Sequence, residues 1–332
     1  MRLCRLFAAT FAAVLLLAGS ASAQVGTVWH VPGDFPTIQA AIDDASVAGG
    51  DTIVVAAGSH AGATVTKAVT IRGEGRATIV DGPVVSPFGR AGFYFPTDGG
   101  GSGATITGLY FDRVELPVFS RGADDVSVTR NTMTRFVQGV TNWGYGEWGN
   151  RWEIADNILL GMYTSCGGGI GIMVGDFMGA TMIDNVIARN TIRGPVLVPK
   201  GDCGGYNAPG ILLFADFRLP VGLGALIYLN RVEENQVRLQ GGARLPGPPP
   251  GFVNVSGIEL SDTRNVPTAL AIVKNDIVYN DLGAMPVPFS FTPDELELVN
   301  TIDNNLTTIS RFLPNRLRTS ARTARPGPAP VR

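Results

Sequence analysis

Short runs of alternating apolar and polar residues recur around asparagine along this chain. The segments IDNVIARN (183–190), YLNRVEEN (228–235) and VKNDIVYN (273–280) each hold two asparagines separated by four residues. Aligning the chain on its turn asparagines gives one series of equivalent positions, with Leu109 in the first unit: Leu109, Asn131, Asn157, Asn185, Asn230 and Asn275. The steps between them are 22, 26, 28, 45 and 45 residues.

Apolar residues flank each of these positions at constant spacing. Three residues before them lie Ile106, Val128, Ile154, Met182, Ile227 and Ile272. Two residues after them lie Phe111, Met133, Leu159, Ile187, Val232 and Ile277. A 22-residue step is too short for a repeat of two packed helices, and it fits one coil of a parallel β-helix with three short strands and three turns. The longer later steps indicate loops inserted into regular coils.

Asparagine suits such turns for two reasons. It tolerates the left-handed backbone of a tight turn, and its amide can hydrogen-bond to an identical amide on the next coil, about 4.8 Å away. We therefore expect the repeated asparagines to be structural.

Both ends of the coil region carry helix signals. In FPTIQAAIDDA, the residues Ile38, Ala41, Ile42 and Ala45 share one helical face, and Thr37 is a candidate N-cap. This predicts a short helix over 37–46 that covers the first coil. At the far end, Thr292 and Glu295 form a candidate capping box, which begins either a closing helix or a last irregular coil.

The opening DFPTIQAAIDDASVAGGDTIVVAAGSH (34–60), followed by AVTIRGEG (68–75), resembles the opening of pectin-lyase-like proteins. This superfamily includes pectin methylesterases, polysaccharide lyases and many exported proteins. The resemblance implies an all-β, single-stranded, right-handed parallel β-helix with an N-terminal capping helix. It is specific for fold and not for activity.

The activity motifs of those enzymes are missing. The chain has no QDT or DFIFG-like segment, and its two histidines, His30 and His60, lie outside the repeats. The lysines of the chain, Lys67, Lys200 and Lys274, carry no local signature of a catalytic base.

The first 23 residues predict an export signal. MRLCRLF is basic, the following stretch is apolar, and SASAQ offers a cleavage site after Ala23. No later run has the length of a membrane span. We expect a secreted, periplasmic or cell-surface protein, with a β-helix domain over 24–303 (coils over 52–283 and a C-terminal cap over 284–303). A basic, Pro-rich tail over 304–332 is predicted to be disordered.

Charge excludes one class of partner. Without the signal and the tail, 18 basic residues face 28 acidic ones, so the body carries a net charge near −10. This argues against nucleic acid as a ligand. A polysaccharide or a cell-envelope glycan remains as the expected partner, and we expect a monomer.

Cys166 and Cys203 remain after the signal is removed, and each precedes a pair of glycines. In an oxidising compartment, two cysteines predict one disulfide. The alternative is two unpaired thiols.

Candidate chemistry lies just before the turn asparagines. If the alignment is in register, Asp156 and Asp184 lie one coil apart, about 5 Å, with Arg130 and Lys274 in the same series. Two carboxylates at that separation can bind Ca²⁺ or share a proton as a catalytic pair. The alternative is that they are ordinary solvent-facing charges at turns.

The segment NWGYGEWGNRW (142–152) holds three of the four tryptophans. Its candidate sugar-binding residues are Trp143, Tyr145, Glu147 and Trp148, on a loop interrupted by glycines. The alternative is a loop folded onto the β-helix as a small second core. The segments 194–210 and 240–252 are predicted to be long loops that wall a groove nearby.

These features support two hypotheses. The first is an exported β-helix protein that binds, and in one version cleaves, a polysaccharide as a lyase or glycoside hydrolase. The second is a structural or surface-interaction module without catalysis.

Overall fold

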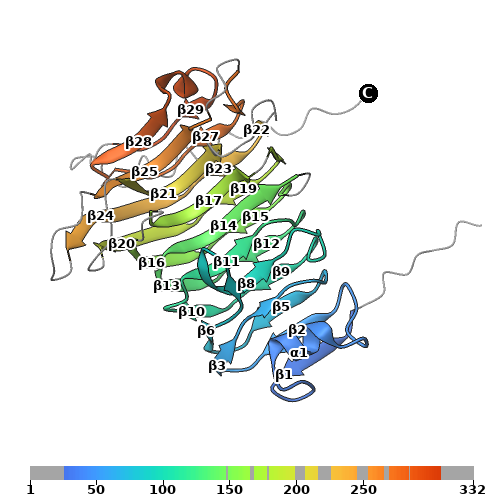
Figure 1. The fold of residues 1–332 in the computed structure, drawn as a ribbon. Helices are drawn as coiled ribbons and strands as arrows, with labels where there is room; N and C mark the ends of the chain where they lie inside the picture. The colour runs from blue at the N-terminus through green and yellow to red at the C-terminus, as the bar shows by residue number, and fades with distance from the viewer. Residues whose placement is uncertain are drawn as a thin grey trace, which may run out of the picture.

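The computed structural model describes residues 26–146, 149–164, 168–177, 179–198, 206–215, 226–244, 253–264, 269–283 and 285–307. Strands dominate these residues, and they stack in chain order from β1 at one end to β28 and β29 at the other (Figure 1). Within the described residues every strand pairing is parallel except that between β7 and β8.

Sheet A has ten strands among the described residues. They are β1 (Val28–Val31), β2 (Thr52–Val55), β5 (Thr70–Gly73), β9 (Thr105–Thr107), β12 (Ser127–Thr129), β15 (Glu153–Ala155), β19 (Val186–Ala188), β23 (Arg231–Glu233), β27 (Asp276–Val278) and β29 (Thr301–Asp303). Sheet B follows sheet A in each coil. Its described strands are β3 (Gly58–Ala61), β6 (Ala77–Asp81), β10 (Tyr110–Asp112), β13 (Thr132–Phe136), β16 (Ile158–Tyr163), β20 (Thr191–Val198) and β24 (Gln236–Arg244).

Sheet C closes each coil. Its described strands are β4 (Ala63–Thr64), β8 (Gly89–Phe95), β11 (Leu116–Ser120), β14 (Gln138–Tyr145), β17 (Ile170–Phe177), β21 (Tyr206–Ala215), β25 (Val253–Asp262) and β28 (Val287–Thr292), with β7 (Val84–Val85) beside β8. A short sheet D precedes sheet A in the later coils, with β18 (Thr181–Ile183), β22 (Leu226–Tyr228) and β26 (Ile272–Val273). These stacked parallel sheets fit a parallel β-helix.

The core is a set of aligned apolar rows. In sheet A one inward row runs in register through eight strands: Ile53, Ile71, Ile106, Val128, Ile154, Ile187, Val232 and Ile277. Each of these side chains is at most 1% exposed. Burying such a side chain stabilises the fold by about 1.5–3 kcal/mol, and because one lies in register in each coil, together they form one continuous core.

The ends differ from each other. Helix α1 (Ile38–Asp43) begins after Thr37, whose Oγ1 accepts a hydrogen bond from the Ala40 N–H at 3.0 Å, as the sequence predicted. Its buried residues Ile38 and Ile42 join the main core. The helix is shorter than the predicted 37–46, and Ala45 lies beyond its end and is exposed. At the far end, the predicted capping box is wrong, because Thr292 belongs to β28. The 3-10 helix η1 (Asp294–Glu297) there has Pro293 at its N-cap and no side-chain cap.

The asparagines form two ladders. In the first, Asn131, Asn157, Asn190, Asn235, Asn280 and Asn305 are linked in succession by backbone and side-chain N–H groups that donate to the next Oδ1. In the second, Asn142, Asn185, Asn230, Asn275 and Asn300 are linked in the same direction. The first ladder lies at the turn between sheets A and B. In the second, Asn185, Asn230, Asn275 and Asn300 lie at the turn before sheet A, whereas Asn142 lies within β14 of sheet C.

The left-handed residue is not the asparagine itself. In the first ladder it is the residue before each asparagine, such as Arg130 (φ 57°) or Asp156 (φ 59°), and in the second it is the residue before Asn185, Asn230 and Asn275, such as Lys274 (φ 54°). The asparagine is buried instead, and its amide satisfies backbone groups: Asn157 Nδ2, for example, donates to the Val128 carbonyl at 2.8 Å. Asparagine therefore recurs for its ladder, and not for its tolerance of positive φ.

Sheets B and C meet at a narrow corner lined by glycine. A Cβ on Gly171 would lie 2.3 Å from the Gly210 carbonyl oxygen, and one on Gly210 would lie 2.5 Å from Val237 Cγ1. Both distances are below van der Waals contact. The first joins neighbouring strands of sheet C and the second joins sheet C to sheet B, so glycine is needed both for the strands and for the two sheets to approach this closely.

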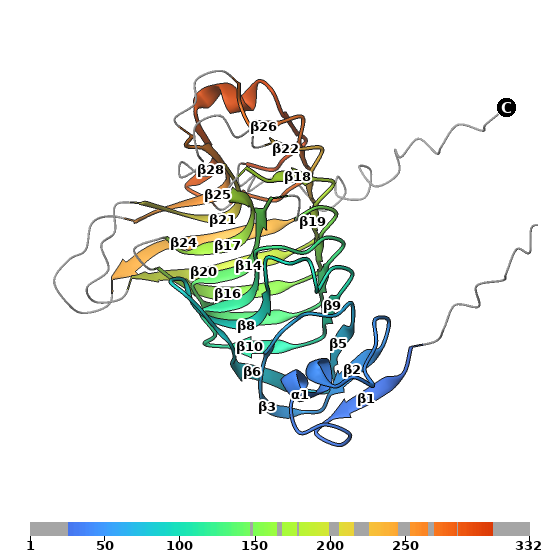
Figure 2. The same ribbon diagram turned by 45° about the vertical axis from the view of Figure 1, so that its right-hand side comes forward.

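Several strands are longer than the sequence predicted. The expected loop at 142–152 begins within β14, and the expected loop segments 194–210 and 240–252 contain the ends of β20, β21 and β24. Figure 2 shows strands β21, β24 and β25 extending beyond the stack on one side. Among the described residues, no helix is long and apolar enough to span a membrane.

Candidate functional site

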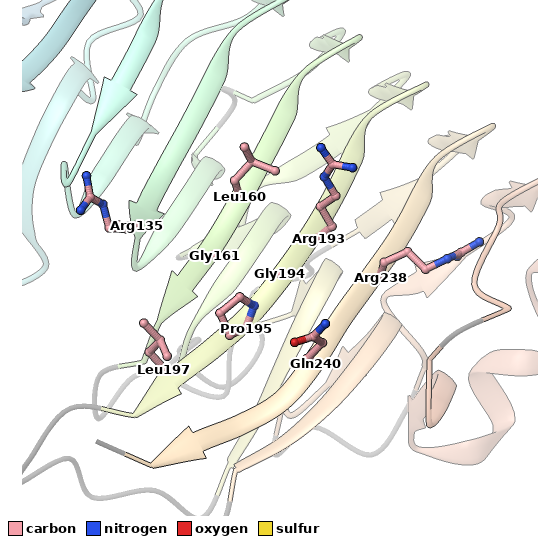
Figure 3. Close-up of a pocket in the computed structure, with 9 residues that line it drawn as sticks. All are labelled: Arg135, Leu160, Gly161, Arg193, Gly194, Pro195, Leu197, Arg238 and Gln240. Carbon is pink, nitrogen blue, oxygen red and sulfur yellow. The ribbon is translucent and has the colours of Figure 1, made fainter. Parts of the chain in front are cut away.

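An open hollow of about 580 Å³ lies on the outer face of sheet B (Figure 3). It spans strands β13, β16, β20 and β24. Its lining residues are Arg135, Leu160, Gly161, Arg193, Gly194, Pro195, Leu197, Arg238 and Gln240. We call this site the sheet B hollow.

Irregular backbone produces the hollow. The register between β16 and β20 shifts between Leu160 and Met162, and the register between β20 and β24 shifts between Pro195 and Leu197. Gly161 (φ 69°) and Gly194 (φ 109°) lie at these bulges in conformations that favour glycine. Because neither has a side chain, the sheet is open at this point.

Arginines border the hollow on three of its four strands. Arg193 on β20 is in register with Leu160 on β16 and with Arg238 on β24. Arg135 lies on β13, at the other end. The four strands take three steps, a span of about 14 Å at the usual strand separation. A chain-like ligand can therefore contact several coils at once.

Two of the arginines are held by carboxylates. Arg135 Nη2 donates to Asp112 Oδ1, which also accepts the Thr134 hydroxyl at 2.9 Å. Partial burial alone would raise the pKa of Asp112, but these hydrogen bonds outweigh it and the pKa falls below its usual value. Arg238 Nη2 lies 2.5 Å from Asp281 Oδ2. The pKa of Asp281 is also lowered, because the contact with Arg238 outweighs burial.

The sequence did contain a signal for this site. Arg193 and Arg238 each lie three residues after an asparagine of the first ladder, Asn190 and Asn235. The alignment was anchored instead on Asn185 and Asn230, which belong to the second ladder. Anchoring it on the later asparagine of each repeated phrase brings the two arginines into one row.

The predicted pairing of Asp156 with Asp184 is wrong. The register of β15 on β19 places Asp156 beside Arg189, whose Nε and Nη2 donate to its two oxygens at 2.9 Å each. Asp184 precedes Asn185 in the second ladder, where the register of β18 on β22 places it beside Leu229. Asn157 lies at the turn between sheets A and B, and Asn185 lies at the turn before sheet A. The 28-residue step in the alignment therefore connects two positions that are not equivalent.

The remaining members of that series are also dispersed. Arg130 lies before Asn131 in the first ladder, and Lys274 lies before Asn275 in the second. Within the described residues, no group of three or more His, Cys, Asp or Glu side chains is arranged to hold a metal ion. A catalytic role for these four residues stays a prediction, without the shared site that motivated it.

Trp143 lies in a second apolar cluster on the outer face of sheet C. Its ring packs against Phe88 at a centroid distance of 5.1 Å, and its Nε1 donates to the Asp176 carbonyl at 3.2 Å. It is only 5% exposed. For this tryptophan the arrangement is the small second core, and not an exposed platform. Trp152 is likewise buried, in the main core.

The remaining predicted residues are Tyr145 and four residues that lie outside the described part of the chain. Tyr145 is the last residue of β14. Glu147, Trp148, Cys166 and Cys203 lie outside the described residues. The predicted disulfide and the aromatic contacts of this loop therefore remain predictions.

Glu259 on β25 is a group that the sequence did not single out. It is 8% exposed, and its Oε2 accepts hydrogen bonds from Asn207 Nδ2 at 3.1 Å and from the Ser256 hydroxyl at 3.2 Å. Burial raises the pKa of this carboxyl above its ordinary value, and the two hydrogen bonds only partly offset the rise. The register places it beside Leu212 and, one strand further, Met173.

Comparisons with known proteins add little to this description. No protein-family model and no curated protein matches the sequence. Among solved structures, the chain is similar to the catalytic domain of a GH87 alpha-1,3-glucanase, in complex with tetrasaccharides, at 12% identity. The match covers 86% of this chain and 70% of that one, with a TM-score of 0.29. A likeness this low carries no argument about function.

Proposed function

We propose that this protein is exported and binds a carbohydrate chain across the outer face of sheet B. The observation that carries the proposal is the sheet B hollow, which combines an apolar floor with polar donors. Leu160, Pro195 and Leu197 offer apolar contact, and the guanidinium groups and the Gln240 amide offer N–H donors. Sugar rings present C–H faces and hydroxyl oxygens together, so both kinds of group find a partner.

Three further points support the proposal. The predicted signal over 1–23 is consistent with a glycan outside the cell. The resemblance of residues 34–75 to pectin-lyase-like proteins is consistent with a right-handed β-helix whose coils form an extended binding face. The hollow crosses several coils, as a polymer-binding site requires.

The hollow favours binding over cleavage. Among the nine described residues that line it, none carries a carboxylate or an imidazole. Glycosidic cleavage usually requires such acid–base groups beside the scissile bond. A binding module is therefore the function that this site supports.

The test is a binding assay with residues 24–332 against a panel of soluble polysaccharides, with and without calcium. We expect at least one glycan to bind, with no new reducing ends and no unsaturated products. Replacing Leu160 by Ser together with Gln240 by Ala should weaken binding by about tenfold, since a contact of each kind is lost.

Arg231→Gln on sheet A serves as the control, because Arg231 is exposed on a different face and should leave binding unchanged. If no glycan binds the folded chain, or if the hollow variant binds as well as the unmodified protein, the proposal is wrong.

A further inference from the structure

The charge of the sheet B hollow is smaller than its three arginines indicate. Arg135 is paired with Asp112, and the side chains of both are less than 40% exposed. Its guanidinium charge is therefore compensated before any ligand arrives. A ligand carboxylate at this position would have to compete with a carboxylate already in place.

Arg238 is held still more closely. Besides its contact with Asp281 Oδ2 at 2.5 Å, its Nη1 donates to the carbonyls of Asp281 and Val237 at 2.7 and 2.9 Å. Figure 3 shows this side chain extending away from Pro195. The guanidinium group of Arg238 therefore points toward the Asp281 carboxylate and the carbonyls of Asp281 and Val237.

Arg193 is different. Its side chain is exposed, it lies on β20 between the other two, and no ion pair or side-chain hydrogen bond joins it to another described residue. Three guanidinium groups and two carboxylates leave one positive charge in the hollow. Arg113, which is also exposed, lies on the far side of Arg135 and does not line the hollow.

On one side Arg193 faces uncharged residues, and on the other its register partner is Arg238, whose charge is already compensated by Asp281. Leu160 is its register partner on β16, and Gly194 and Pro195 follow it along β20. A single uncompensated charge on an apolar floor complements a ligand with one acidic group between uncharged parts. A uniformly charged polymer would place further acidic groups beside Asp112 and Asp281, where like charges repel.

We propose that the sheet B hollow selects a sparsely charged glycan, in which one acidic group contacts Arg193 and the neighbouring sugars are neutral. This inference rests on the proposed carbohydrate binding. The acidic group is a carboxylate or a sulfate, because the guanidinium fork can pair with the oxygens of either.

The experiment compares oligosaccharides of one backbone and one length. One is neutral, one carries a single central acidic group, and one is acidic at every sugar, with carboxylate and sulfate versions assayed separately by calorimetry. We expect the singly acidic ligand to bind roughly tenfold tighter than the neutral one, through one charge-assisted contact. The fully acidic ligand should gain no more than about twofold over the singly acidic one.

Two variants locate the effect. Arg193→Gln should bring the affinities for the singly acidic and the neutral ligand to the same value, because the glutamine amide keeps an N–H donor but carries no charge. Asp281→Asn releases the charge of Arg238, so it should selectively improve binding of the fully acidic ligand. Arg231→Gln on sheet A is the matched arginine control and should change neither.

Each other outcome has a distinct meaning. If the fully acidic ligand binds tenfold tighter than the singly acidic one, or if Arg193→Gln keeps the preference, the inference is overturned while carbohydrate binding stands. If none of the ligands binds the unmodified protein, the proposed function fails, and this inference fails with it.

Discussion

Arg189 lies directly beside Asp156 in the next coil, and its Nε and Nη2 each donate to one carboxylate oxygen at 2.9 Å. Both residues occupy the left-handed position before a ladder asparagine. Their side chains are 45% and 44% exposed, so water and salt screen the pair.

We expect this pair to contribute less than about 1 kcal/mol to the free energy of unfolding. A double-mutant cycle with Asp156→Asn and Arg189→Gln, measured by urea unfolding at low and high salt, gives the coupling energy. It should be small and should shrink with salt. A coupling above about 3 kcal/mol would instead mean that the pair is effectively buried.

Replacing Asn190 by Ala should cost about 3 kcal/mol or more. Its Oδ1 accepts from the backbone and side-chain N–H groups of Asn157, and its Nδ2 donates to Ile154 and Asn235. Removing the amide leaves buried donors and acceptors without partners.

Asn305→Ala is the matched variant at the end of the same ladder. Asn305 is partly exposed at the end of the ladder, so removing its amide would let water reach the groups of the buried Asn280 that it contacts. Its cost should be about 1 kcal/mol. Equal costs for the two variants would show that the interior position confers no additional stability.

Trp143→Ala should destabilise the protein by about 3–5 kcal/mol, because a buried aromatic ring leaves a cavity. Trp143→Phe should cost less, since an aromatic ring can still contact Phe88 and Phe119. Guanidinium unfolding of both variants measures the difference. Glycan binding in the folded alanine variant should persist, and its loss would favour a direct role of Trp143 in binding.

Glu259→Gln should change how stability depends on pH. The folded-state pKa lies above the ordinary value of 4.5, so the folded protein binds more protons than the unfolded chain between the two pKa values. Stability is therefore lost as pH rises through that window. It is unaffected below the window, where both states are protonated.

Glutamine cannot ionise and keeps an acceptor for Asn207 and Ser256. The unfolding midpoints of the parent and of Glu259→Gln should thus be similar near pH 4 and diverge toward about pH 7, with the variant more stable. Glu153→Gln, an exposed site on sheet A, should show no such divergence. A gap that stays constant with pH would contradict the expected burial effect.

The coil architecture was predictable because the repeated phrase encodes it directly. The apolar residues three before and two after each aligned position are all buried in the structure. The register was not predictable from one asparagine series, because each phrase contributes to both ladders. Asn185 and Asn190 are five residues apart. Aligning Asn157 with Asn185, in place of its true partner Asn190, pairs Asp156 with Asp184 and not with Arg189.

The sheet B hollow was harder to foresee for a different physical reason. It depends on the backbone conformations of Gly161 and Gly194 and on two local register shifts. Such bulges depend on how neighbouring strands pair, and neither glycine differs in sequence from an ordinary turn glycine. The pairing of Arg135 with Asp112 likewise follows from strand register, since the two lie 23 residues apart.

The first asparagine ladder presents the same donors and acceptors to the coil on either side, although its successive members are separated by 26, 33, 45, 45 and 25 residues. A coil copied within the gene would therefore find matching contacts above and below itself, whatever the length of its loops. The rod can lengthen by internal duplication, and each duplicate can then diverge in its outward residues while the ladder preserves the fold.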